Sequence, residues 1–161
     1  MVVCGLSVFA AAPVLVEHVT ERPKRGGALG SSDYKPTSAE VPFITKVSAD
    51  EQDTGGMMKD YVLDGHDGRY VGWFGVVREV TEAKGETRLL VEHKGFDGLT
   101  DTHILALDFN GAGDFTVRVP GVGHKLERLT LVKVYGVVKT TRGVAEVTAD
   151  YVRTWHQGAF T

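Results

Sequence analysis

Between Tyr70 and Trp155 the chain alternates apolar and polar residues in short runs, which is the pattern of half-buried β-strands. The predicted strands are GRYVGWFGVVREV (68–80), TRLLVEHK (87–94), THILALDF (102–109), DFTVRV (114–119), LTLVKVYGVV (129–138) and VAEVTADYVRTW (144–155). The residues predicted to form the core are Val76, Leu89, Val91, Leu105, Leu107, Phe115, Val117, Val132, Val134 and Val147. We therefore expect an all-β fold, a small Greek-key barrel of mostly antiparallel strands.

Glycines and short polar runs predict how these strands bend and connect. Gly72 and Gly75 interrupt the first strand, where glycine typically marks a bulge or a sharp bend. Gly85 and the run TRG at 141–143 predict two tight hairpins. In the strand that precedes the second hairpin, alternation turns Lys133, Tyr135 and Lys139 outward. PGVGHKLERL at 120–129 is expected to cross the barrel as a link that could hold one helical turn.

The N-terminal 16 residues resemble the apolar part of a secretory signal. Residues 2–16 carry no charge and are short for a bilayer span, which needs about 20 apolar residues. Val8 and Ala10 fit the two small positions before a cleavage site. Export to the periplasm or cell envelope is therefore expected, with membrane contact only through this segment. The alternatives are lipidation at Cys4, a buried N-terminal strand or helix, and a cytoplasmic protein.

Residues 17–68 lose the strand pattern and are predicted to be an irregular tether. Their Pro, Gly, Ser and charged residues cannot bury enough apolar surface to offset the chain entropy. Within them, VPFITKV (41–47) could form a brief strand, and Ser48 with Glu51 could cap a helical turn. The predicted organisation is thus a signal-like segment (1–16), a tether (17–68), a barrel (69–156) and a tail (157–161).

The barrel region also resembles a known fold family. A glycine-bent first strand, a hairpin, a central strand and then VKVYGVVKTTRGVAEVTADYVRTW (132–155) are similar to bacterial OB-fold domains, including exported ones such as the starvation-inducible outer-membrane lipoprotein family. The resemblance covers residues 69–156 and implies a fold, without an activity. THILALDF exceeds the five-strand plan, so a barrel or sandwich with six or seven strands is the alternative.

Candidate chemistry in the sequence is sparse. His93, Asp97, Asp101 and His103 could ligate zinc, but a polar turn explains them more simply, so we expect no metal site. The chain has no G-x-S-x-G elbow, no phosphate loop of the G-x-x-x-x-G-K type and no G-x-G-x-x-G turn. We therefore expect neither a cofactor nor an enzyme.

Charge favours a protein partner over a nucleic acid. The formal net charge is -3, from 18 Lys and Arg against 21 Asp and Glu, whereas nucleic-acid modules usually carry a basic surplus. The sequence predicts a non-enzymatic exported domain with a binding or scaffold role, for a protein or another component of the cell envelope. The candidate ligand-binding residues are Arg78, Arg88, Lys94, Arg118 and Tyr135.

The alternative is a nucleic-acid-binding OB-fold domain. Its bases would stack on aromatic rings, and its phosphates would follow basic side chains. The rings would be Trp73, Phe96 and Tyr135, and the cations Arg88, Lys94, Arg118, Lys133 and Lys139.

Overall fold

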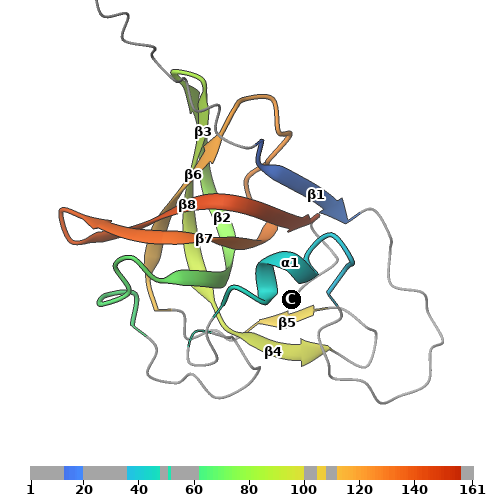
Figure 1. Ribbon diagram of the computed structural model, residues 1–161. Helices are drawn as coiled ribbons and strands as arrows, with labels where there is room; N and C mark the ends of the chain where they lie inside the picture. The colour runs from blue at the N-terminus through green and yellow to red at the C-terminus, as the bar shows by residue number, and fades with distance from the viewer. Residues whose placement is uncertain are drawn as a thin grey trace, which may run out of the picture.

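The computed structural model describes residues 13–19, 36–47, 51, 62–99, 105–107 and 112–156. Figure 1 shows its elements: β1 (Leu15–Val19), α1 (Val41–Ile44), β2 (Tyr70–Ala83), β3 (Glu86–Lys94), β4 (Phe96–Leu99), β5 (Leu105–Leu107), β6 (Asp114–Pro120), β7 (Leu131–Thr141) and β8 (Val144–Trp155). The predicted all-β class is confirmed, because one four-residue helix accompanies eight strands among these residues.

Five of the strands close into a barrel with the OB-fold arrangement. They lie in the order β8-β6-β3-β2-β7, and pairing of β7 with β8 closes the circle. β6 and β8 are parallel, whereas the other pairs in the circle are antiparallel. Counted along the chain, the barrel strands follow the cyclic order 1-2-3-5-4, which is a Greek-key path. The predicted OB-fold-like barrel is thus confirmed.

β2 is long enough to pair on both sides of the barrel, as the predicted curvature requires. Residues 70–76 pair with β7 and residues 74–83 pair with β3. The bulge lies between Val77 and Glu79, and not at the glycines as expected. Gly72 and Gly75 instead permit close approach: a Cβ at Gly72 would lie 2.6 Å from the Tyr135 ring, and one at Gly75 would lie 2.3 Å from Val91.

The two predicted hairpins are confirmed. Lys84 and Gly85 join β2 to β3 with φ angles of 54° and 77°, and Arg142 and Gly143 join β7 to β8 with 54° and 76°. Positive φ at both central residues is typical of the two-residue turn whose twist matches antiparallel strands. The link between β6 and β7, residues 121–130, contains no helix.

The core agrees with the alternation of the sequence except at one position. The predicted residues Leu89, Val91, Phe115, Val117, Val132, Val134 and Val147 are at most 1% exposed. Val76 is only partly buried, because Val71, Trp73 and Val77 take the inward positions of β2 and leave Val76 on the outer face. The side chains of Leu105 and Leu107 lie outside the described residues.

The predicted extra strand does not enter the barrel. β5 pairs with β4 in a separate two-stranded antiparallel sheet. Both strands come between β3 and β6 in the chain. The five-strand plan is therefore kept, and the alternative of six or seven barrel strands is wrong.

The segments before the barrel differ from the expected signal-like segment and tether where the structure describes them. Leu15–Val19 form β1, a sixth strand of the main sheet that pairs in parallel with β8. Val14 and Val16 pack against the barrel core. Residues 41–44 form one turn of helix and not a strand, because Pro42 fixes a helical φ in the first turn and supplies no N–H for a sheet. Ser48, the expected cap, lies outside the described residues.

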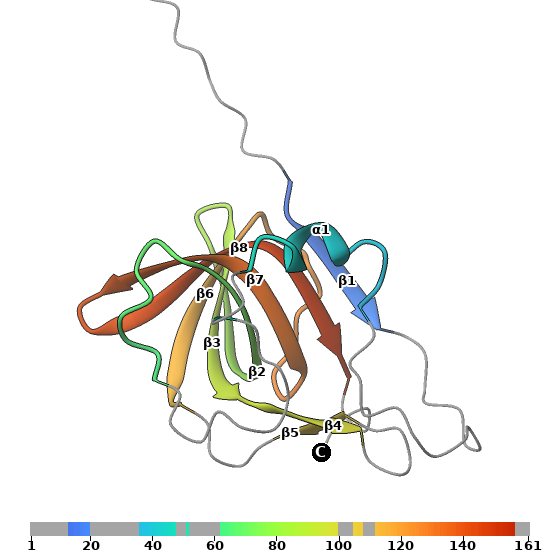
Figure 2. The same ribbon diagram turned by 60° about the horizontal axis from the view of Figure 1, so that its bottom comes forward.

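β1 and α1 lie on the same side of the barrel, against the ends of β7 and β8 (Figures 1 and 2). They cover an outer barrel face that would otherwise meet water. Lys133 and Tyr135 do point away from the barrel core, as predicted, yet they are 7% and 1% exposed. Within the described part of the chain, no helix is long and apolar enough to span a bilayer.

Candidate functional site

Ionised side chains form a network on the outer surface of β3, β6 and β8. Arg88 Nε donates to Glu86 Oε1 at 2.6 Å, and Arg118 Nη2 donates to Glu86 Oε2 at 2.8 Å. Glu146 on β8 lies 3.8 Å from Arg88 Nη1 and 4.0 Å from Arg118 Nε. Arg88 and Arg118 face each other in the β3–β6 register, so the carboxylates offset the repulsion between two opposed cations.

A second group of charges lies further along β3. Arg78 Nη1 and Lys94 Nζ each donate to the Glu92 carboxylate at 2.7 Å. Together the two groups form a surface of four cations and three carboxylates. We call it the charged face: Arg78, Glu86, Arg88, Glu92, Lys94, Arg118 and Glu146.

Hydrogen bonds within the charged face favour the ionised forms of Glu86, Glu92 and Arg118. Hydrogen bonds from Arg118 and then Arg88 keep the pKa of Glu86 below its usual value, and those from Lys94 and then Arg78 do the same for the pKa of Glu92. Glu86 in turn raises the pKa of Arg118. A carboxylate stabilised in this way is a poor general base at neutral pH, so the arrangement suits recognition by charge and hydrogen bonds better than proton transfer.

The five predicted binding residues do not form one site. Arg78, Arg88, Lys94 and Arg118 lie on the charged face, whereas Tyr135 lies on the outer face of β7 beneath residues 36–47. Two rings named for base stacking are buried in the structure: Trp73 is 2% exposed and Tyr135 is 1% exposed. The side chain of Phe96 lies outside the described residues.

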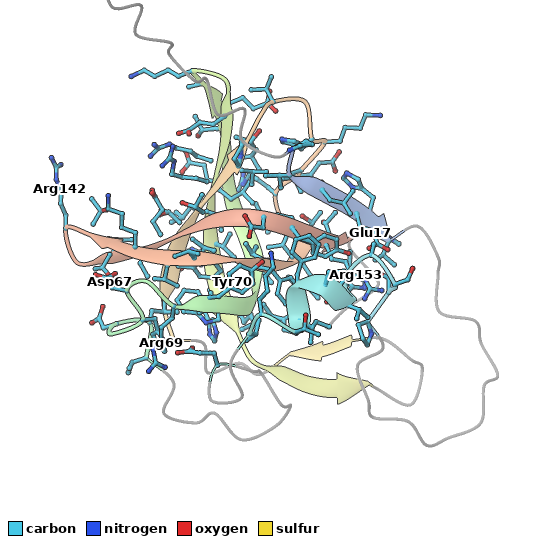
Figure 3. The ribbon with its side chains drawn as sticks, viewed as in Figure 1. Glu17, Asp67, Arg69, Tyr70, Arg142 and Arg153 are labelled. Atoms are coloured by element: carbon cyan, nitrogen blue, oxygen red, sulfur yellow. The ribbon has the colours of Figure 1, made fainter. Side chains whose placement is uncertain are left out.

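Tyr135 belongs to a buried polar cluster that the sequence analysis missed. The Glu40 carboxylate accepts a hydrogen bond from the Tyr135 hydroxyl at 2.7 Å and from Arg153 Nη1 at 2.9 Å. The Glu17 carboxylate accepts from the Tyr151 hydroxyl and, at 2.8 Å, from Thr37 Oγ1. We call Glu17, Glu40, Tyr135, Tyr151 and Arg153 the acid–tyrosine cluster, and Figure 3 shows Glu17 and Arg153 beside α1.

The acid–tyrosine cluster joins segments that are far apart in the chain. Glu40 is 95 residues from Tyr135 and 113 residues from Arg153 in the chain. Partners so far apart produce no short sequence motif by which the cluster could be recognised. Burial, and then the hydrogen bond to Glu17, raises the pKa of Tyr151, so this hydroxyl stays protonated and donates. These contacts attach the N-terminal segments to the barrel.

The histidines provide no metal site among the described residues. No group of three His, Cys, Asp or Glu residues there could hold a metal ion. His93 is 5% exposed and lies against the rings of Trp73 and Phe115. Burial, followed by the charges of Lys94 and His66, lowers the pKa of His93 to about 4. Asp101 and His103, with the Asp97 side chain, lie outside the described residues.

Comparisons with known proteins leave the geometry as the basis for assigning function. The chain matches no family model, and the searches of curated proteins and of solved structures find no match either. The OB-fold assignment rests on the order and pairing of the strands. The resemblance to exported outer-membrane lipoproteins stays a prediction.

Proposed function

We propose that this protein is a non-enzymatic, exported OB-fold domain with a binding or scaffold role, and that its charged face contacts a protein or another cell-envelope component of mixed charge. One observation carries the proposal: Arg78, Arg88, Lys94 and Arg118 each donate to a carboxylate at 2.6–2.8 Å. Five of its seven residues lie on β3 and β6, the second and third barrel strands, which are the usual binding surface of OB-folds.

The pairing of charges favours a mixed-charge partner over a nucleic acid. A phosphate backbone would have to displace Glu86, Glu92 and Glu146 or lie beside them. A partner with both signs of charge can instead extend the existing pattern of donors and acceptors. The net charge of -3 adds to the unfavourable field that a polyanion would meet.

A labelled single-stranded oligonucleotide tests this choice by fluorescence anisotropy through a salt series. The native chain should show no salt-sensitive binding at low salt. The double variant Glu86→Gln, Glu146→Gln should gain such binding, because it removes the carboxylates that neutralise Arg88 and Arg118. Glu79→Gln with Glu127→Gln removes the same charge outside the charged face and is the control.

Salt-sensitive binding by the native chain, abolished by replacing Arg88 and Arg118 together, would contradict the proposal. It would establish the alternative, a nucleic-acid-binding OB-fold domain.

Export is supported by the uncharged residues 2–16 and is compatible with the position of β1. Val14 and Val16 pack against the barrel core, so the exported domain should retain them. Cleavage after Ala10 would keep both, together with all of β1. Expression in a bacterium followed by mass measurement of the periplasmic fraction should give a chain beginning at Ala11. A chain that keeps Met1 and stays in the cytoplasm would contradict export.

A further inference from the structure

The outer face of β2, β7 and β8 has a composition that is unusual for a solvent-facing sheet. Tyr70 of β2, Tyr135 of β7, and Tyr151 and Arg153 of β8 alternate with core residues and therefore point away from the barrel. We call these four residues the aromatic platform. Gly72, between Tyr70 and the inward Trp73, leaves the space in which the Tyr135 ring lies. Rings with an arginine form a surface that suits an acidic and aromatic ligand.

Residues 36–47 occupy the aromatic platform, and we call them the cover segment. Phe43 stacks on Tyr151 with ring centroids 4.8 Å apart and planes inclined by 20°. Three residues earlier, the fully buried Glu40 accepts hydrogen bonds from Tyr135 and Arg153. The platform thus binds two side chains that are three residues apart: its hydrogen-bond donors bind the Glu40 carboxylate, and its Tyr151 ring stacks on Phe43.

The cover segment is held by side-chain contacts and forms no strand pairing with the barrel. α1 has four residues, no side-chain cap and no buried residue of its own, and Val41 is 45% exposed. Glu40, Phe43 and Val47 contact the platform, Ala39 and Ile44 pack beside them, and Lys46 Nζ lies 5.3 Å from the centre of the Tyr70 ring. The barrel, in contrast, closes through its own five strands. Opening of the cover segment therefore need not break a single barrel pairing.

We propose that the aromatic platform is a peptide-binding surface, which the cover segment occupies as a built-in ligand, and that its partner is a peptide with a glutamate followed three residues later by an aromatic residue. This surface is separate from the charged face. The partner competes with the cover segment, so binding requires the cover segment to open. The apparent affinity is reduced by the fraction of molecules that are closed.

A labelled peptide of residues 36–47 (PTSAEVPFITKV) is the probe for this surface. The full-length variant Glu40→Gln, Phe43→Ala weakens the cover segment and should bind the peptide at least about tenfold more tightly than the native chain. Adding Arg153→Ala to that variant should reverse the gain, because the peptide glutamate loses its guanidinium. Val41→Thr, at an exposed position of the same segment, should bind as the native chain does.

Three results would overturn the proposal. The first is absence of peptide binding by the weakened variant while its circular dichroism spectrum stays native. The second is equal binding of a peptide that lacks the glutamate and the phenylalanine. The third is preference of the weakened variant for a single-stranded oligonucleotide over the peptide.

Hydrogen exchange on the native chain tests the opening even if the weakened variant fails to fold. The amides of Phe43, Ile44, Thr45 and Val47 donate within the cover segment. They should exchange at least about tenfold faster than the paired amides of β7 and β8, through an opening that leaves the barrel protected. Exchange of both sets at the same rate, by global unfolding alone, would show that the cover segment is an integral part of the fold and would sink the proposal.

Discussion

Two buried ionisable side chains of this protein are accommodated in different ways. Glu40 is 0% exposed and is tolerated because Tyr135 and Arg153 donate to its two oxygens. His93 is accommodated differently, as a neutral ring between aromatic side chains whose Nδ1 accepts the Ala112 N–H at 3.4 Å. Hydrogen-bond donors thus accommodate the buried Glu40, whereas burial lowers the pKa of His93.

His93 predicts how acid affects stability. Its pKa is about 4 in the folded chain against 6.5 for an ordinary histidine. Between these values the unfolded chain binds a proton that the folded chain does not, so stability falls as the pH falls from 6.5 towards 4. The loss should reach about 3 kcal/mol, because one pKa unit corresponds to about 1.4 kcal/mol. Urea denaturation at several pH values measures it.

The variant His93→Gln is the control for this effect. It should flatten the dependence on pH between 6.5 and 4.5. Glu86 and Glu92, whose pKa values are lowered by their cationic partners, should keep their own loss of stability below pH 4.5. An unchanged slope between pH 6.5 and 4.5 in His93→Gln would assign the effect to other groups.

Among the elements, β7 shows how one strand serves two hydrophobic layers. Val132, Val134 and Val138 face the barrel core, whereas Tyr135 faces residues 36–47. Towards the β7–β8 hairpin this covering ends, and Val137 is 44% exposed. The cost of a polar substitution should therefore depend on the face and on the position along the strand, and not on the strand alone.

Val134→Asp should abolish cooperative folding. Val134 is 0% exposed and lies opposite Trp73 of β2 and Val152 of β8, so an aspartate would bury a charge without a partner at a cost of several kcal/mol. Val137→Asp, three residues on, should cost less than about 1 kcal/mol. Melting curves followed by circular dichroism compare the two. Equal destabilisation by both would contradict the assignment of the faces of β7.

For the whole molecule, the N-terminal segments pack on the outside of a barrel that closes without them. β1 extends the sheet at β8, and Glu17 and Glu40 connect both segments to β7 and β8 through the acid–tyrosine cluster. The described residues thus form a five-stranded barrel with β1 and α1 attached. Figure 2 shows β1 and α1 beside the barrel.

Removal of residues 1–40 should lower the melting temperature and leave a cooperatively folding barrel. The deletion removes Val14 and Val16 from the surface of the barrel core, and loss of two such apolar side chains costs about 3 kcal/mol. Since 1 kcal/mol corresponds to at least about 2 °C in a domain of this size, the loss should be about 6 °C or more. Calorimetry measures it.

The matched control for the deletion changes exposed residues of the same segments in the full chain. Leu15→Ser with Val41→Thr should melt close to the native chain, because both positions are about half exposed. A deletion that melts at the native temperature would show that the segments add nothing to stability. It would support the predicted tether.

Within the barrel, the residues themselves determined most of what the structure contains. Apolar residues alternate with polar ones around Leu89 and Val91, and again around Phe115 and Val117. Each of these strands must therefore bury its apolar face, whichever strand it pairs with. Lys84–Gly85 and Arg142–Gly143 specify their hairpins because the required positive φ is a local property. The cations of the charged face were also identified from their outward positions, although their pairing with particular carboxylates was not.

Only the tertiary structure shows the features that depend on contacts between residues distant in the chain. The sequence around Glu40 does not predict its hydrogen bonds with Tyr135 and Arg153. The sequence around Leu15–Val19 likewise does not predict that β1 pairs in parallel with β8. The rings at Tyr135, Tyr151 and Trp155 on outward positions were the available signal that something covers this face. Local pattern determines which face of a strand is apolar, whereas the identity of the covering segment follows from long-range packing and charge pairing.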